Sequence, residues 1–139
     1  MPSGLRLLDT VTLSEVIKGQ DPSVLSHAQE YLSVHRNFQF SIITRYEILR
    51  GLKAKNAFRQ VERFEDQFRA STVFPLTDEI VVRAAEIYGA LHQRGALIED
   101  ADILIAATAL VHGFPVVTEN ADHFHRVPNL TVESWRRLA

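Results

Sequence analysis

The chain has 139 residues, a length that suits one domain with a core of its own, so we expect residues 1–139 to form a single domain. It contains no cysteine, which excludes disulfides and thiolate metal sites, and its formal net charge of −2 means that any nucleic-acid binding must come from a local basic patch. No apolar run approaches the roughly 20 residues of a membrane span, and the N-terminal segment MPSGLRLLDT lacks the apolar region of a signal peptide, so we expect a soluble, cytoplasmic protein.

The first half of the chain alternates short apolar runs with helical patterns. Leu5–Leu8 predicts a strand that ends at Asp9, and the helical pattern after it stops at Gly19. Pro22–Val34 predicts an amphipathic helix with Asp21 as its N-cap. The carboxylate of Asp9 would therefore lie where a strand ends, and open α/β sheets bind ligands beyond the carboxyl ends of their strands.

A second expected strand, Phe38–Ile43, leads into a helix that carries Glu47. Thr44 is a candidate N-cap of this helix. A threonine followed three residues later by a glutamate also fits a capping box, which would give Glu47 a purely structural role.

A basic segment follows, in which three phenylalanines are interleaved with lysine and arginine. One interpretation is a pair of helices whose charged faces are solvated and whose phenylalanines lie in the core. The other is a flank that binds a phosphate backbone, and the two interpretations are compatible. The candidate phosphate-binding residues are Arg45, Arg50, Lys53, Lys55 and Arg59.

The second half of the chain repeats the alternation of strand and helix. Val73–Leu76 predicts a strand, and Thr77 or Asp78 then caps a helix over Glu79–Gln93. A further helix, a buried strand, a polar turn and an edge strand are expected at Ile103–Val111, Pro115–Thr118, Glu119–Asp122 and Thr131–Val132, with Trp135 as a packing residue. This order predicts an α/β fold in which helices cover both faces of a parallel sheet.

Several acidic or amide side chains fall where the ends of the strands would gather them. They are Asp9 after the first strand, Glu47 on the helix after the second, Asp102 at the start of a helix, and Asn120 with Asp122 in the turn after the late strand. Singly, each has a structural explanation as a cap, a partner of a helix dipole or a solvated turn residue. Together they predict a cation site, because clustered carboxylates repel one another unless a cation binds among them.

A site made of oxygen atoms suits a hard divalent cation. Mg²⁺ is commonly held by one or two carboxylates, water and a substrate phosphate, which makes a phosphodiester the natural missing ligand. The chain has no GxxxxGK[ST] or GxGxxG motif, which argues against a nucleotide-dependent kinase, ATPase or dehydrogenase. His123 and His125 lie beside the turn without a metal-binding spacing such as HExxH, and we favour phosphate contact or surface exposure for them.

The segments LLDT, SIITRYEILRG and GALIEDADILIAATALVHGFPVVTENADHFHRVPNLTV resemble the PIN-domain ribonucleases, specifically the VapC-type toxins of bacterial toxin–antitoxin pairs. The likeness spans nearly the whole chain. It implies a PIN-like three-layer α/β/α sandwich with a central parallel sheet of four to five strands. It also implies an endoribonuclease that depends on Mg²⁺ or Mn²⁺, is usually a homodimer, and is neutralised by a VapB-like antitoxin.

The resemblance places the first three acidic residues of the family on Asp9, Glu47 and Asp102. The fourth falls on Asn120, which offers a carbonyl oxygen but no charge, and Asp122 would compensate for the missing charge. The resemblance also suggests that neighbouring hydroxyls and acids support these residues. The candidates are Thr10, Ser41, Thr44, Glu99, Asp100 and Thr118, and the basic flank described above becomes the candidate RNA-binding surface.

Two other functions remain open. One is a catalytically silent PIN-like module that binds RNA or a partner, which is favoured by Asn120 and by Val11, where relatives usually carry an asparagine. The other is a small phosphohydrolase with an aspartyl nucleophile. That class expects a second aspartate two residues after Asp9, and this chain has Val11 there.

Overall fold

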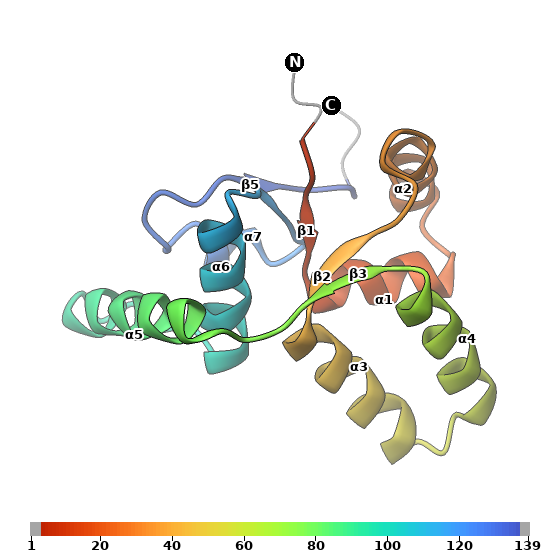
Figure 1. Ribbon diagram of the computed structural model, residues 1–139, viewed down its shortest axis with the longest axis horizontal. Coiled ribbons are helices and arrows are strands. Elements are labelled where there is room, and N and C mark those ends of the chain that lie inside the picture. The colour runs from red at the N-terminus through yellow and green to blue at the C-terminus, as the bar shows by residue number, and fades with distance from the viewer. Residues whose placement is uncertain (1–3, 137–139) are drawn as a thin grey trace.

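The structure is a computed structural model that describes residues 4–136. A five-stranded parallel sheet runs through its middle (Figure 1). Its strands are β1 (Leu7–Leu8), β2 (Gln39–Ser41), β3 (Thr72–Phe74), β4 (Val116–Val117) and β5 (Val132–Glu133). They lie in the order β3-β2-β1-β4-β5, and each of these pairings is parallel. Because β1 is the central strand, the residue that follows it lies in the middle of the carboxyl edge of the sheet.

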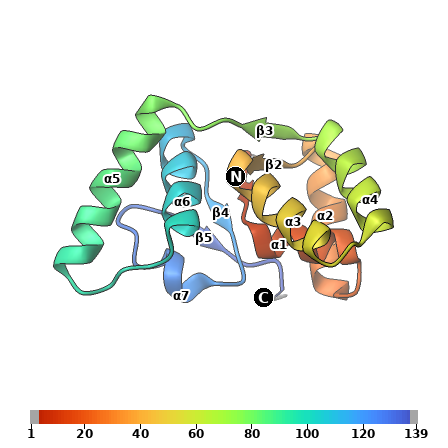
Figure 2. The same ribbon diagram turned by 90° about the horizontal axis from the view of Figure 1, so that it is seen from below.

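Helices cover both faces of this sheet, as the sequence predicts. Within residues 4–136 they are α1 (Thr10–Lys18), α2 (Pro22–His35), α3 (Ile42–Ala54), α4 (Phe58–Arg69), α5 (Asp78–Gln93), α6 (Asp100–His112) and α7 (Ala121–Phe124). Figures 1 and 2 place α5 and α6 on one side of the sheet and α1, α2 and α4 on the other. In the described part of the chain, no helix is both long and apolar enough to cross a bilayer.

The alternation of side chains along the strands divides the core into two clusters. Leu7 and Val116 pack with α5 and α6, whereas Leu8 and Val117 pack with α1, α2 and Trp135. All four of these strand residues are fully buried, which explains why the strands read as continuous apolar runs. Burial of each such side chain stabilises the fold by about 1.5–3 kcal/mol.

The start of α3 differs from the expectation and changes the interpretation of Glu47. The strand expected over Phe38–Ile43 ends at Ser41, whose extended backbone and hydroxyl cap the helix by accepting a hydrogen bond from the Ile43 amide at 3.0 Å. Thr44 is fully buried inside the helix. The prediction of Thr44 as N-cap, and with it the capping box to Glu47, is wrong.

The other boundaries shift by a few residues. The first strand begins at Leu7 rather than Leu5, and α6 begins at Asp100 rather than Ile103. The turn expected at Glu119–Asp122 contains the start of the short helix α7. The expected caps Asp21 and Thr77 are confirmed, because their side chains accept hydrogen bonds from the first backbone amides of α2 and α5.

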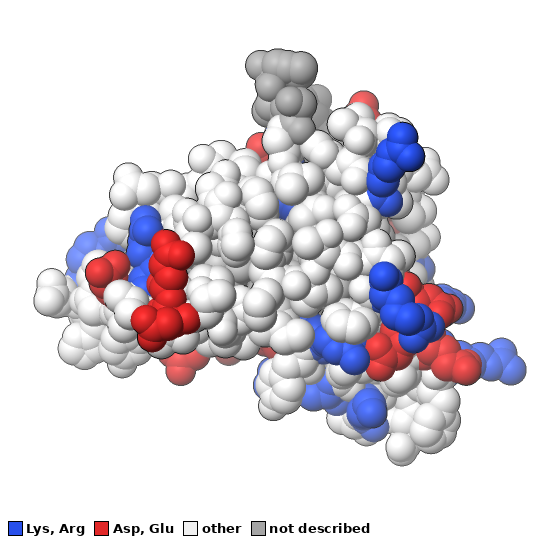
Figure 3. Space-filling model, viewed as in Figure 1, with Lys and Arg blue, Asp and Glu red and all other residues white. Residues whose placement is uncertain are grey.

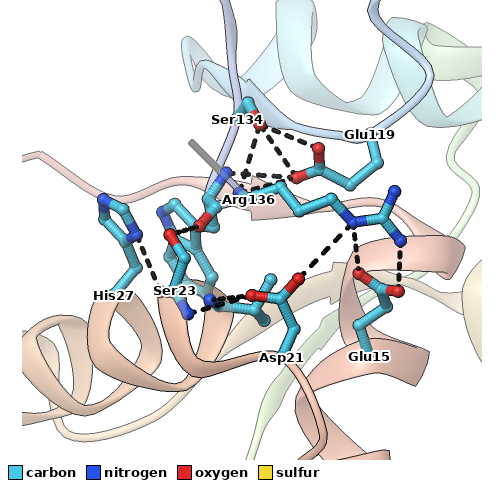
Figure 4. Close-up of polar contacts among 9 residues, drawn as sticks. Glu15, Asp21, Ser23, His27, Glu119, Ser134 and Arg136 are labelled. Carbon is cyan, nitrogen blue, oxygen red and sulfur yellow. Dashed lines mark hydrogen bonds and ion pairs between the residues drawn. The ribbon is translucent and has the colours of Figure 1, made fainter. Parts of the chain in front are cut away.

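A polar cluster joins α1, the start of α2, the turn after β4 and the segment after β5 (Figure 4). We call it the Arg136 cluster, and it consists of Glu15, Asp21, Glu119, Ser134 and Arg136. The Arg136 guanidinium donates to Glu15 at 3.0 Å and lies 3.8 Å from Asp21. The Glu119 carboxylate accepts hydrogen bonds from the Ser134 hydroxyl at 2.8 Å and from the Arg136 amide at 3.1 Å. These contacts fix Glu119, which directly precedes Asn120 in the sequence.

Candidate active site

Asp9 is buried at the carboxyl end of β1, where it is also the N-cap of α1. Its Oδ1 accepts a hydrogen bond from the Thr12 amide at 2.9 Å, and its Oδ2 accepts one from the Thr118 hydroxyl at 2.5 Å. Burial raises the pKa of Asp9 from its ordinary 3.8 to about 6, although the bonds from Thr118 and Thr12 oppose the rise. The negative charge of Asp102 adds to it. This carboxylate is therefore held in one orientation at an electrostatic cost.

Two buried threonines connect Asp9 to the neighbouring strand. The Thr12 hydroxyl donates to the Val117 carbonyl at 3.1 Å and ties the first turn of α1 to β4. The Thr118 hydroxyl, which donates to Asp9, also accepts a hydrogen bond from the Asn120 amide at 2.7 Å. The sequence points to Thr118 because it adjoins the turn, whereas Thr12 has no such signal.

Glu47 projects from α3 toward the start of α1. Its Oε1 accepts a hydrogen bond from the Thr10 hydroxyl at 2.6 Å, and the Thr44 hydroxyl lies 3.1 Å from that of Thr10. The Arg50 guanidinium is 3.7 Å from the other carboxylate oxygen of Glu47. Thr10 thus contacts the glutamate directly, and Thr44 contacts Thr10. Arg50 supplies a positive charge beside the acidic group, which the sequence pattern alone does not reveal.

Asp102 lies in the first turn of α6, as expected. Its side chain is 16% exposed, and its Oδ2 lies 3.3 Å from Nδ1 of His123. Burial raises the pKa of Asp102 above its ordinary value, His123 lowers it, and the charges of Glu47 and Glu99 raise it further. Since the charge of Asp102 also acts on Asp9, the three acidic residues form one electrostatic group.

The turn after β4 brings one of its two candidate residues to the acidic group. Asn120 lies with its side-chain nitrogen 2.8 Å from Nδ1 of His123, which in turn contacts Asp102. The Asp122 side chain is 89% exposed and pairs with Arg126 at 3.4 Å. The structure therefore joins Asn120 to the site through His123 and directs Asp122 elsewhere.

His123 is the residue of this site that the sequence analysis undervalued. It was expected at the surface or at a phosphate, yet only a third of its side chain is exposed and it contacts Asp102. A signal existed: His123 follows Asn120 by three residues, a spacing that places side chains on one face of a helical turn. Three further residues were candidates to support the acidic group. Ser41 caps α3, and Glu99 and Asp100 are exposed at the start of α6.

The donor set fits a divalent cation that keeps part of its water shell. Across residues 4–136, no three His, Cys, Asp or Glu side chains converge closely enough to hold a metal ion by themselves. The raised pKa values of Asp9 and Asp102 nevertheless mark a place where negative charge is crowded and desolvated. Carboxylates with water and substrate oxygens are the usual surroundings of Mg²⁺, so these residues suit such an ion.

The basic flank lies over α3 and α4, where Figure 3 shows lysine and arginine interspersed with acidic residues. Arg45 pairs with Glu65 at 2.8 Å and stacks on the Phe68 ring at 3.6 Å. Phe58 is 74% exposed, so the expectation that all three phenylalanines lie in the core is wrong for this one, although Phe64 is buried. Of the candidate phosphate-binding residues, Arg50, Lys53, Lys55 and Arg59 are exposed.

Comparison with known proteins gives a consistent result. Residues 6–130 match the family model described as PIN domain. The chain is 30% identical to ribonuclease VapC19 of Mycobacterium tuberculosis over 129 residues, which is 91% of this chain and 97% of that protein. It is 36% identical to ribonuclease VapC1 of Methanocaldococcus jannaschii over 87 residues. This match covers 63% of this chain and 62% of that protein, so it spans less than two thirds of the relative. The structure of DNA-bound VapBC from Salmonella typhimurium aligns with a TM-score of 0.84 at 25% identity, covering 95% of this chain and 99% of that one.

Proposed function

The chain belongs to the PIN-domain family, and on that premise we propose that it is a metal-dependent endoribonuclease and the toxin of a toxin–antitoxin module. The observation that carries the proposal is the electrostatic group of Asp9, Glu47 and Asp102 at the carboxyl edge of the sheet. Its support from outside the molecule is that the relatives matched above are named ribonucleases.

Asp9, Glu47 and Asp102 would hold a Mg²⁺ or Mn²⁺ ion. A divalent cation supplies the Lewis-acid charge that phosphodiester hydrolysis requires. The chain contributes the orientation of the carboxylates, because hydroxyl donors fix Asp9 and Glu47 before substrate arrives. We assign the fourth position to Asn120, since Asp122 is directed toward Arg126.

The exposed cations of α3 and α4 would guide RNA toward this acidic edge. Arg50 lies closest, because it already contacts Glu47, and Lys53, Lys55 and Arg59 extend the positive charge away from the site. Contacts of this kind bind the phosphate backbone and carry little sequence information. Arg45 is held by Glu65 and Phe68, so its main role in this proposal is to fix α3 against α4.

The proposed protein partner is a VapB-like antitoxin, with a homodimer of this chain as the core of the complex. The support is the likeness to a VapBC structure and the presence of exposed apolar side chains on α5. Val81, Val82 and Tyr88 are about half exposed on that helix. Apolar surface of this kind is typical of interfaces between proteins.

The proposal is tested by incubating the purified protein with total cellular RNA in Mg²⁺, Mn²⁺ or EDTA, beside Asp9→Ala, and mapping new RNA ends. The expected result is a discrete set of cuts that requires metal and is absent in the variant. Identical ends for both proteins in every condition would reject the nuclease. If both proteins instead bind RNA without cutting it, the catalytically silent binding module takes its place.

A further inference from the structure

We propose that His123 is a direct ligand of the cation, together with Asp102 and Asn120, and that the site consequently prefers Mn²⁺ to Mg²⁺. The inference rests on the cation site of the proposed function. It goes beyond that function by adding a nitrogen atom to a ligand set that the sequence describes as oxygen alone.

The positions of the donor atoms support shared coordination. Nδ1 of His123 lies 3.3 Å from Oδ2 of Asp102 and 2.8 Å from the side-chain nitrogen of Asn120. Two adjacent ligands on an octahedral ion with bonds of about 2.1 Å are roughly 3.0 Å apart. The spacing between Nδ1 and Oδ2 therefore suits two atoms that bind the same cation.

With the side-chain nitrogen of Asn120 facing Nδ1, hydrogen bonding satisfies this arrangement poorly. With a lone pair on Nδ1, the ring accepts from the Asn120 amide but directs that lone pair toward a carboxylate. With a hydrogen on Nδ1, the ring donates to Asp102 but faces the hydrogens of the Asn120 amide group. Turning the amide so that its oxygen faces inward removes the conflict, whether a hydrogen on Nδ1 or a cation then lies among the three atoms, and it directs a lone pair of each residue toward one point.

The local fold holds His123 in place. It lies on α7, where its amide donates to the Asn120 carbonyl at 3.1 Å and the next residue, Phe124, is fully buried in the core. His125 is exposed, so two histidines two residues apart differ in their surroundings. A side chain positioned in this way before binding loses little freedom when it becomes a ligand.

The nitrogen ligand determines the preferred ion. Imidazole binds first-row transition metals better than Mg²⁺, while carboxylate and carbonyl oxygens suit Mg²⁺, Ca²⁺ and Mn²⁺. Of the two ions of the proposed function, Mn²⁺ is the one that accepts both kinds of donor. A site of Asp102, Asn120 and His123 should therefore select Mn²⁺ over Mg²⁺, whereas His123→Asp would make an all-oxygen site that accepts Mg²⁺ equally well.

Pulsed electron paramagnetic resonance of the Mn²⁺-loaded protein tests the inference without RNA. We expect modulation of the electron spin echo by a histidine nitrogen in the wild type, with the frequencies changed by ¹⁵N-histidine labelling. The modulation should persist in His125→Gln and vanish in His123→Gln. Absence of nitrogen modulation in the wild type, or its persistence in a folded His123→Gln protein, would overturn the inference.

Calorimetric titration with Mn²⁺ and Mg²⁺ gives an independent measure. His123→Gln should weaken Mn²⁺ binding by about ten-fold or more, and His123→Asp should lower the ratio of Mn²⁺ to Mg²⁺ affinity. An unchanged ratio would contradict a nitrogen ligand. Protein that shows the nitrogen signal but never cuts RNA would reject the nuclease and leave the ligand assignment intact, while metal-dependent cutting without the signal would do the reverse.

Discussion

The hydroxyl of Thr118 donates a hydrogen bond to the Asp9 carboxylate across 109 positions of sequence. The two residues follow neighbouring parallel strands, β1 and β4, so the pairing of those strands brings them together. The same hydroxyl accepts a hydrogen bond from the Asn120 amide. One small side chain thus connects the central carboxylate to the turn that carries Asn120 and His123.

Replacement of Thr118 by valine should disturb the site more than the fold. The variant leaves the Asn120 amide and one oxygen of Asp9 without a partner, at a cost of about 1–3 kcal/mol in the free energy of unfolding. We expect RNA cleavage to fall strongly as well. Thr108→Val is the matched control, because this buried hydroxyl donates only to the Leu104 carbonyl of its own helix. Equal cleavage by both variants in an RNA-end assay would contradict the orienting role.

The stability of the metal-free protein should depend on pH through Asp9. Its pKa of about 6 in the folded protein exceeds the ordinary 3.8, so the folded state holds this proton more tightly than the unfolded chain does. The resulting stability is complete below pH 3.8 and is lost as pH rises through 6. The free energy of unfolding in EDTA should fall by about 1 kcal/mol between pH 5 and pH 7.5.

Urea unfolding at several pH values checks this expectation, with Asp9→Asn as the comparison. The variant should lose part of the pH dependence and be more stable than the wild type at pH 7.5. If the two proteins change in parallel with pH, Asp9 does not carry the effect.

Asp102→Asn should abolish cleavage and keep the fold. Removal of one negative charge from a crowded group relieves repulsion, so the variant should melt at or above the wild-type temperature in EDTA. Asp100→Asn is the control, since Asp100 lies in the same helical turn but is exposed. A variant at position 102 that is unfolded at room temperature would identify Asp102 as a structural residue.

Different residues of the basic flank should affect RNA binding and the stability of the fold. The triple variant Lys53→Ala, Lys55→Ala, Arg59→Ala removes three exposed charges, and the slope of log binding constant against log salt should weaken by about 2. Arg45→Ala should instead lower stability, because it breaks the ion pair with Glu65 and the packing of the guanidinium on Phe68. Binding in EDTA at several salt concentrations, beside thermal melts, measures both. An unchanged slope in the triple variant would exclude this surface as the path of the RNA.

The parts of the fold that follow from local chemistry were predictable. Continuous apolar runs indicate buried parallel strands, and Asp21 and Thr77 cap their helices with their own side chains. The start of α3 was not, because Ser41 and Thr44 are both good caps. Only the pairing of β2 with β1 and β3, which is a tertiary property, decides that the strand ends at Ser41.

The candidate site divides in a similar way. Asp9 and Asp102 follow from their positions at the ends of a strand and the start of a helix. The directions of side chains in the turn after β4 do not, because they depend on α7, which is anchored by the burial of Phe124. That anchor turns His123 toward Asp102 and leaves the charge of Asp122 in solvent.

The Arg136 cluster bears on the order in which the molecule folds. Arg136 and Glu15 are separated by 121 positions, and contacts that close such long loops form slowly compared with helices and neighbouring strands. The cluster fixes Glu119, and Asn120 comes directly after it. During refolding, the core can therefore become compact while this turn is still unformed. Recovery of cleavage should lag behind recovery of the far-ultraviolet circular dichroism of the helices, and Arg136→Ala should lengthen the lag.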